Sequence, residues 1–172
     1  FVDRLNQIIS SYYQRLSLTQ NKIKIAYQGP VEWSDHLQDD LIEKYRRSLD
    51  RDRVFKMTHV GIHRDDYIFS LDDQFVTSVA SQGQKRLIIV GLKCALIEVI
   101  EEMSGDKPIL LLDDVFSELD KQKRIALFDV LHLNTQAVIT TTDLEDVQLW
   151  LKDQITVFEV KDGKVFERSS IL

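Results

Sequence analysis

Three groups of residues suited to phosphate chemistry follow one another in the middle of the sequence. Ser81-Gln82-Gly83-Gln84 comes first, the adjacent carboxylates Asp113 and Asp114 come second, and Ser117-Glu118-Leu119-Asp120 comes third. A Gly-x-x-x-x-Gly-Lys-Ser/Thr loop, which holds phosphates through backbone N–H groups and one lysine, does not occur in these 172 residues. The sequence therefore predicts one half of a nucleotide-driven protein, with the phosphate-holding half supplied from elsewhere.

The first group is predicted to open a helix, with Ser81 as its N-cap. The N–H groups of a first helical turn lack intrahelical partners and form the positive end of the helix dipole. Gly83 lets an anion approach the backbone without a Cβ in the way. The group therefore predicts an anion site suited to a phosphate. An ordinary serine cap followed by a tolerated glycine is the alternative.

The second group follows the apolar run Ile109–Leu112, which is typical of a central parallel strand. Asp113 and Asp114 would then lie at the carboxyl end of that strand, where α/β sheets bind ligands. One carboxylate can hold Mg²⁺, often through water, while its neighbour orients or deprotonates an attacking water. A turn or a helix lead-in is the alternative for two adjacent acids, and the other two groups favour the chemical interpretation.

The elements before residue 57 are predicted to be mostly helical. A helix over 1–18, a strand over 23–27 and a second helix with Ser34 as N-cap account for this part. The second helix has one apolar face, made of Leu37, Leu41, Ile42, Tyr45 and Leu49. We interpret the basic residues of its second half as cations near a helix carboxyl end, with a nucleic-acid patch as the alternative; they are Arg46, Arg47, Arg51, Arg53 and Lys56.

The remaining residues alternate between strands and helices, which predicts an α/β sheet. A strand, turn and strand over 58–69 and a hairpin turn at Asp72-Asp73 lead to a long helix over 82–103. That helix is apolar nearly all round, so we expect it to be buried on most sides. The later elements are strands at 109–112 and 137–140, helices at 120–131 and 144–151, and a hairpin over 155–167 with its turn at Asp162-Gly163.

Composition limits the possible partners and compartment. The formal net charge of −6 repels a polyanion, so the main docking surface for any nucleic acid is expected outside this segment. The apolar stretches are far shorter than the ~20 residues of a membrane span, and no signal peptide is visible, so we expect no membrane contact and a cytoplasmic location. Cys94 lies in an apolar helical run and is predicted to be a small buried side chain. The start at Phe1 suggests that a longer protein was cut here.

The three groups, in this order and spacing, resemble the motifs of ABC-type ATPases, in the Ser-Gln-Gly-Gln form associated with the RecF family. Ser81–Arg86 resembles the signature motif, Ile109–Asp114 the Walker B strand, and Ser117–Asp120 the D-loop, while Val60–Asp66 resembles a RecF segment before the signature. The likeness spans roughly residues 57–145. It implies the carboxyl-terminal part of a RecF-like protein. The expected fold is α/β, with a helical signature-lobe segment over 1–56 and part of an ABC-type ATPase head, a parallel-rich sheet with flanking helices, over 57–172.

The resemblance also implies roles for individual residues. In such ATPases two heads form a head-to-tail dimer around two ATP molecules, each held by the P-loop of one head and capped by the signature helix of the other. By this likeness Ser81 and the backbone of Gly83 meet the γ-phosphate, and Gln82 and Gln84 shape the turn. Asp113 would then serve Mg²⁺.

Four further roles follow from the same resemblance. Asp114 would position the hydrolytic water, Ser117 and Asp120 would reach across the dimer, and Thr142 falls where many ABC proteins have a switch histidine. Transport-type relatives usually have glutamate at the position of Asp114, and the shorter side chain, together with threonine at 142, predicts slow hydrolysis. Without a P-loop, this piece alone is expected to be inactive.

The resemblance implies a biological role and leaves two alternatives open. The role is ATP-dependent homodimerisation at gapped or junction DNA in repair, recombination and replication, together with a RecR-like mediator protein that loads recombinase. Another ABC-type head, of the SMC or RecN kind, is the first alternative, although no coiled-coil heptads occur around residues 1–56. The second alternative is a protein-interaction module without ATP turnover.

Overall fold

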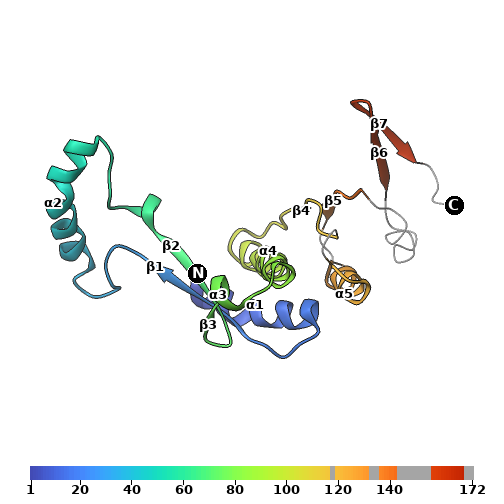
Figure 1. The fold of residues 1–172 in the computed structure, drawn as a ribbon, viewed down its shortest axis with the longest axis horizontal. Helices are drawn as coiled ribbons and strands as arrows, with labels where there is room; N and C mark the ends of the chain where they lie inside the picture. The colour runs from blue at the N-terminus through green and yellow to red at the C-terminus, as the bar shows by residue number, and fades with distance from the viewer. Residues whose placement is uncertain (117–118, 132–135, 143–155, 169–172) are drawn as a thin grey trace.

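The structure is a computed structural model that describes residues 1–172 apart from 117–118, 132–135, 143–155 and 169–172. The molecule is elongated (Figure 1): a body of helices and short strands lies in the middle, a projecting helix lies at one end and a β-hairpin at the other. The α/β prediction is confirmed, because helices accompany one parallel and two antiparallel sheets among the described residues.

Two helices form the centre of the body, α1 (Val2–Ser17) and α4 (Gln82–Ser104). One face of α1 is apolar at helical spacing, as predicted, and this face is buried. Gly91 of α4 lies at the contact, where an added Cβ would be 3.5 Å from the backbone nitrogen of Tyr13. The buried side chains of α1 are Leu5, Ile8, Ile9, Tyr12, Tyr13, Leu16 and Ser17.

An antiparallel sheet lies beside α1. Strand β1 (Ile23–Gln28) pairs with β2 (Asp66–Leu71), and β2 pairs with β3 (Gln74–Phe75). The predicted hairpin turn at Asp72 and Asp73 is confirmed, with both residues at positive φ, 47° and 63°. The predicted division at residue 56 stays a prediction, although β1 and β2 pair across it.

Side chains of α1 satisfy the other edge of β1. The Asn6 side-chain amide donates to the Ile25 carbonyl oxygen over 2.8 Å and accepts from the Ile25 N–H over 2.7 Å. Ser10 does the same at Ile23, accepting over 3.0 Å and donating over 2.9 Å. The helix therefore replaces a neighbouring strand and leaves no open edge at these two residues.

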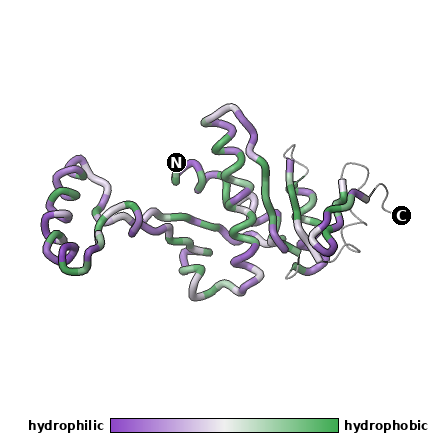
Figure 2. Tube along the Cα trace, turned by 90° about the horizontal axis from the view of Figure 1, so that it is seen from above, coloured by the Kyte–Doolittle hydropathy of each residue, from purple (hydrophilic) through white to green (hydrophobic). Residues whose placement is uncertain are grey.

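The projecting helix α2 (Leu37–Phe55) corrects one sequence prediction, the position of its N-cap. Its N-cap position is His36, two residues after the predicted Ser34, whose hydroxyl instead accepts from the His36 N–H over 3.2 Å. No residue of α2, all of which is described, is buried. The predicted apolar face does not pack on the body because β1 and β2 carry α2 away from it (Figure 2).

Of the predicted strand, turn and strand over 58–69, the second strand is confirmed and the first is wrong. Gly61 has φ +136° and is followed by the 3₁₀ turn η1 (Ile62–Arg64), so only residues from Asp66 onward form a strand. The glycine supports a backbone conformation that a continuous strand does not use. The residues just before β2 therefore form a turn, whereas the sequence pattern predicted that they begin as a strand.

The remaining elements follow the predicted order, apart from the short helix α3, which was not predicted. They are α3 (Val76–Val79), β4 (Leu110–Leu112), α5 (Lys121–Leu131), β5 (Ala137–Ile139), β6 (Val157–Lys161) and β7 (Lys164–Arg168). Strands β4 and β5 pair in parallel, with Leu111 opposite Val138. The β6–β7 turn has Asp162 and Gly163 at φ 51° and 73°, so the Asp-Gly prediction is confirmed. The predicted helix 144–151 lies outside the described residues.

Two further predictions concern single features. Cys94 is buried, 4% exposed, and burial raises the pKa of its thiol to about 11, so it packs as predicted and does not supply a thiolate near neutral pH. Among the described helices, none combines the length and apolar character that crossing a bilayer requires.

Candidate functional site

The start of α4, residues 81–84, forms an exposed helix tip. Ser81 is the N-cap, and its hydroxyl accepts from the Gln84 N–H over 3.3 Å. The Gln84 side chain returns a bond, with its Oε1 accepting from the Ser81 N–H over 2.9 Å. This reciprocal capping box fixes the entry of the chain into the helix, and the predicted N-cap is confirmed.

The capping box leaves specific donors for a ligand. The N–H groups of Gln82 and Gly83 are first-turn donors without an intrahelical acceptor. Because the Ser81 oxygen is used as an acceptor, its hydroxyl proton is still available to donate. Ser81 and Gln82 are exposed, so the positive end of the helix faces solvent. The helix tip can therefore offer several donors to an anion, as the sequence predicted; anion binding itself stays a prediction.

The predicted carboxylates meet a residue that sequence reasoning missed. Asp113 and Asp114 follow β4, and Thr140 follows β5. The Thr140 hydroxyl donates to the Asp113 carboxylate and accepts from the Asp114 N–H over 3.1 Å. We name these three residues the carboxylate edge. Parallel pairing explains their meeting, because Leu112 lies opposite Ile139 and the Thr140 N–H donates to the Leu112 carbonyl over 2.9 Å.

The backbone at the carboxylate edge has an unusual conformation. Asp114 has φ 45°, the left-handed region that residues with a Cβ enter rarely. The turn ends the strand, and Asp113 beside it is exposed whereas Asp114 is half-buried. A sequence signal for Thr140 existed, since the strand 137–140 was predicted to end on this polar residue. That Thr140 lies beside Asp113 could not be known without the register of β4 and β5.

The other predicted site residues lie apart from this contact. Asp120 caps α5, accepting from the Lys123 N–H over 3.0 Å and from the Lys123 ammonium over 2.7 Å, so its predicted N-cap role is confirmed. The Lys123 side chain, and then the backbone N–H groups, hold the pKa of Asp120 below its usual value. Thr142 is exposed just beyond β5, and Ser117 lies outside the described residues.

The residues present fit Mg²⁺ only as part of a nucleotide site. Within the described part of the chain, no three acidic, histidine or cysteine side chains group together as a complete metal site. Mg²⁺ commonly takes one or two protein carboxylates and completes its shell with waters and substrate phosphates. The exposed carboxylate of Asp113, oriented by Thr140, suits that role.

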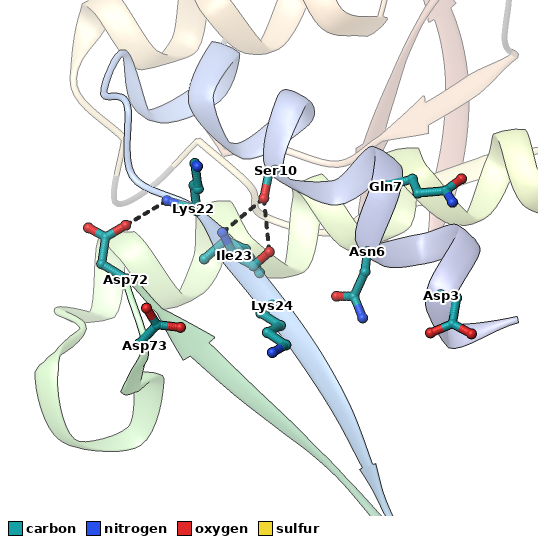
Figure 3. A pocket seen from close by; sticks show the side chains of 9 residues that line it. All are labelled: Asp3, Asn6, Gln7, Ser10, Lys22, Ile23, Lys24, Asp72 and Asp73. Carbon is teal, nitrogen blue, oxygen red and sulfur yellow. Dashed lines mark hydrogen bonds between the residues drawn. The ribbon is translucent and has the colours of Figure 1, made fainter.

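A separate cavity of about 650 Å³ lies between α1, β1 and the β2–β3 turn (Figure 3). Its polar groups already serve the fold. Ser10 bonds to the edge of β1, and the Asp72 carboxylate accepts from the Lys22 N–H over 2.8 Å and from the Asn21 amide. The Asn21 bond, followed by the Lys22 N–H, lowers the pKa of Asp72. The cavity therefore holds structural pairs and lacks the arrangement of a catalytic site.

One face of the parallel β4–β5 pair is open. Ile109, Leu111 and Val138 are 56%, 61% and 51% exposed, although they are apolar residues on or beside these strands. The Lys93 ammonium of α4 donates to the Leu111 carbonyl over 2.8 Å. Parallel sheets are normally covered on both faces.

No family model matches the chain. Curated relatives match nearly all of it. The DNA replication and repair protein RecF of Streptococcus agalactiae serotype V is 38% identical over 167 residues, which are 96% of this chain and 45% of that protein. RecF of Lactobacillus delbrueckii subsp. bulgaricus is 33% identical over 170 residues, 95% of this chain and 45% of that protein. The chain thus spans just under half the length of these relatives.

Solved structures of RecF proteins also match nearly all of this chain. The recombination mediator protein RecF of the RecFOR pathway, in its RecF-ATPrS form, has a TM-score of 0.70 and 28% identity over 96% of this chain and 44% of that one. The RecF-ATP form has a TM-score of 0.69, also at 28% identity, over 97% and 44%. An SMC head bound to the C-winged helix domain of ScpA has a TM-score of 0.58 at 14% identity, over 97% and 43%, which is a likeness of fold alone.

Proposed function

We propose a function that starts from the family of this chain, which belongs to the RecF family and corresponds to the carboxyl-terminal part of such a protein. The chain supplies two of the three parts of a nucleotide-dependent dimer switch. The first part is the helix tip, and the second is the carboxylate edge. The third part, a P-loop, belongs to the remainder of the protein. The observation that carries the proposal is the exposed helix tip, whose capping box joins Ser81 and Gln84 and leaves the Gln82 and Gly83 N–H groups without an acceptor inside the helix.

The helix tip acts on the ATP of a second copy. The Ser81 hydroxyl and the N–H of Gly83 donate to the γ-phosphate held by the partner's P-loop, and Gln82 and Gln84 keep the turn in shape. An exposed helix start is suited to this contact, because the dipole and the unpaired N–H groups both favour an anion. ATP would then join two copies and its loss would release them.

The carboxylate edge acts on the ATP of its own head. Asp113 holds Mg²⁺, which neutralises phosphate charge when bound, and Asp114 orients the attacking water. The short Asp114 side chain and the absence of a histidine at Thr142 make hydrolysis slow. Ser117 and Asp120 reach across the dimer in this proposal. The nucleotide therefore acts as a timer for a DNA-bound state.

The biological setting comes from the family. We place this dimer at gapped or junction DNA, where a RecR-like mediator protein joins it and recombinase is loaded. The net charge of −6 argues against this chain as the main DNA-docking surface. The remainder of the protein therefore supplies most of the DNA contact.

A charge reversal at the helix tip tests the proposal in the full-length protein. Ser81→Arg puts a long cation where the phosphate cap must close, so ATP-dependent dimerisation measured by sedimentation velocity should be lost while ATP binding to the monomer persists. Ser104→Arg, at the other end of the same helix, is the matched control and should dimerise normally. Dimerisation of the Ser81→Arg variant at wild-type ATP concentrations would refute the capping role.

The interaction-module alternative has its own test. The 172-residue chain lacks a P-loop, so we expect no tight ATP binding by it in isolation, whereas a chain extended at its amino end should bind. Equilibrium dialysis with labelled ATP compares the two directly. Micromolar binding by the isolated chain would contradict the division of the site between two parts.

A further inference from the structure

We propose that Thr140 is a positioning residue that orients the carboxylate edge for Mg²⁺, an inference that rests on the proposed function. Its hydroxyl lies between two adjacent acidic residues and contacts both. It donates to the side chain of Asp113 and accepts from the backbone of Asp114. One hydroxyl therefore fixes the side chain expected to bind the cation and the backbone of the residue expected to orient water.

Hydrogen-bond chemistry makes threonine suited to this position. A threonine hydroxyl has one proton and two lone pairs, so it can donate to a carboxylate and accept from an amide at the same time. The Thr140 hydroxyl donates to Oδ1 of Asp113, and this bond restricts rotation of the carboxylate. Oδ2 is then the oxygen that binds the cation. Valine has nearly the same shape and offers neither bond.

The backbone of Asp114 gives an independent reason for the contact. A residue with a Cβ at φ 45° is strained, and such conformations persist where the surrounding structure holds them. Here the Asp114 N–H is held by Thr140. Because this turn sets the directions of both carboxylates, the loss of the hydroxyl should disturb the two together.

The position of Thr140 separates this role from a purely structural one. Thr140 is exposed, and the Asp113 side chain that it contacts is exposed as well. Hydrogen bonds between exposed groups contribute little to folding, because water replaces them. The backbone N–H of residue 140 donates to the Leu112 carbonyl, and this bond does not depend on which side chain residue 140 carries. Removal of the hydroxyl should therefore leave the sheet intact and appear in the response to Mg²⁺.

The experiment measures the Mg²⁺ concentration that gives half-maximal dimerisation of the full-length protein with a non-hydrolysable ATP analogue. Thr140→Val should raise that concentration by ~10-fold, the usual effect of losing a residue that orients a metal ligand. Thr140→Ser keeps the hydroxyl and should stay close to wild type. Thr156→Val, an exposed threonine before β6, is the matched control and should not change the curve.

Two additional variants make the result decisive. Thr140→Ala removes the hydroxyl with less bulk and should match Thr140→Val, which excludes a packing effect of the valine. Asp113→Ala should remove most of the Mg²⁺ dependence. If Asp113→Ala shifts the curve and Thr140→Val does not, or if Thr140→Ser is as impaired as Thr140→Val, the role of Thr140 is wrong. If the wild type shows no Mg²⁺-dependent response to the analogue, or if Asp113→Ala leaves that dependence unchanged, the proposed function itself fails.

Discussion

Helices α4 and α2 are the two longest in the described part of the chain, with 23 and 19 residues, and their surroundings are opposite. α4 lies in the body against α1, and its buried residues include Leu87, Ile88 and Val99. α2 projects from the end of the β1–β2 pair, and none of its residues is buried. Both helices carry apolar residues, so composition does not separate them. The strands that lead to α2 decide its environment.

The projecting helix is held by local interactions instead of a core. Arg47 pairs with Glu43 one turn earlier, and the Ser48 hydroxyl donates to Asp52 over 3.0 Å. The His59 ring nitrogen Nδ1 lies 2.7 Å from the Asp52 carboxylate and ties the end of the helix to the following loop. The Arg47–Glu43 pair is exposed and contributes little, and the half-buried contacts of Asp52 act only at the end of the helix. Substitutions in α2 should therefore affect stability far less than those in α4.

The largest expected difference comes from the same substitution in the two helices. Leu87→Ala in α4, where the side chain is 1% exposed, should lower the free energy of unfolding by about 3 kcal/mol. Leu49→Ala in α2, where the side chain is 46% exposed, should change it by less than about 0.5 kcal/mol. Urea unfolding of the 172-residue chain, followed by circular dichroism, compares them. Equal losses would mean that α2 is covered in solution.

A second substitution tests the hydrogen bonds between the Asn6 side chain and the edge of β1. Asn6→Ala leaves the N–H and carbonyl of Ile25 without their partners, so it should cost about 2 kcal/mol in the same assay. Gln7→Ala, at the exposed neighbouring position of α1, is the control and should cost much less. A near-neutral Asn6→Ala variant would indicate that water satisfies this edge.

The contact between α1 and α4 can be sharpened by a small stabilising change. An added Cβ at Gly91 would meet Tyr13 N, Leu16 Cδ1 and Tyr12 Cβ at 3.5–3.7 Å, which is ordinary van der Waals contact. Gly91→Ala should therefore stabilise the chain by up to about 1 kcal/mol through helix propensity. Gly91→Leu should destabilise it by overpacking. Destabilisation by alanine would show that the two helices approach more closely than the structure indicates.

The smallest effect is expected in the projecting helix and depends on pH. The hydrogen bond from the His59 side chain, more than any other contact, lowers the pKa of Asp52. Because the folded pKa is depressed, the stabilisation is present above the ordinary aspartate pKa and is lost as the pH falls through the lowered value. His59→Phe keeps a ring beside Phe55 and should raise the pKa of Asp52 toward its ordinary value.

Carbon-detected NMR titration of the Asp52 carboxylate measures this shift. The thermal unfolding midpoint of the body should stay unchanged in the His59→Phe variant, since α2 has no buried side chain. An unchanged Asp52 titration would show that the Ser48 hydroxyl and the His59 backbone N–H hold its pKa low without the imidazole.

Much of the fold could be predicted because the deciding interactions are local. The capping box of Ser81 and Gln84 and the turn at Asp162-Gly163 each involve residues a few positions apart. The errors arose where a segment depends on distant parts of the chain. The start of α2 was placed at Ser34, two residues too early. What lies against its apolar face could not be predicted, because periodicity identifies an apolar side without identifying what covers it.

The sequence by itself determined where most of the helices and turns lie and which residues are candidates for phosphate chemistry, because caps, turn residues and periodic patterns act over a few residues. Only the tertiary structure decided that α2 stands apart from the body and that Thr140 bonds to Asp113, 27 positions away. The parallel register of β4 and β5 brings those two residues together. That register is a long-range property, fixed by how the strands and helices pack.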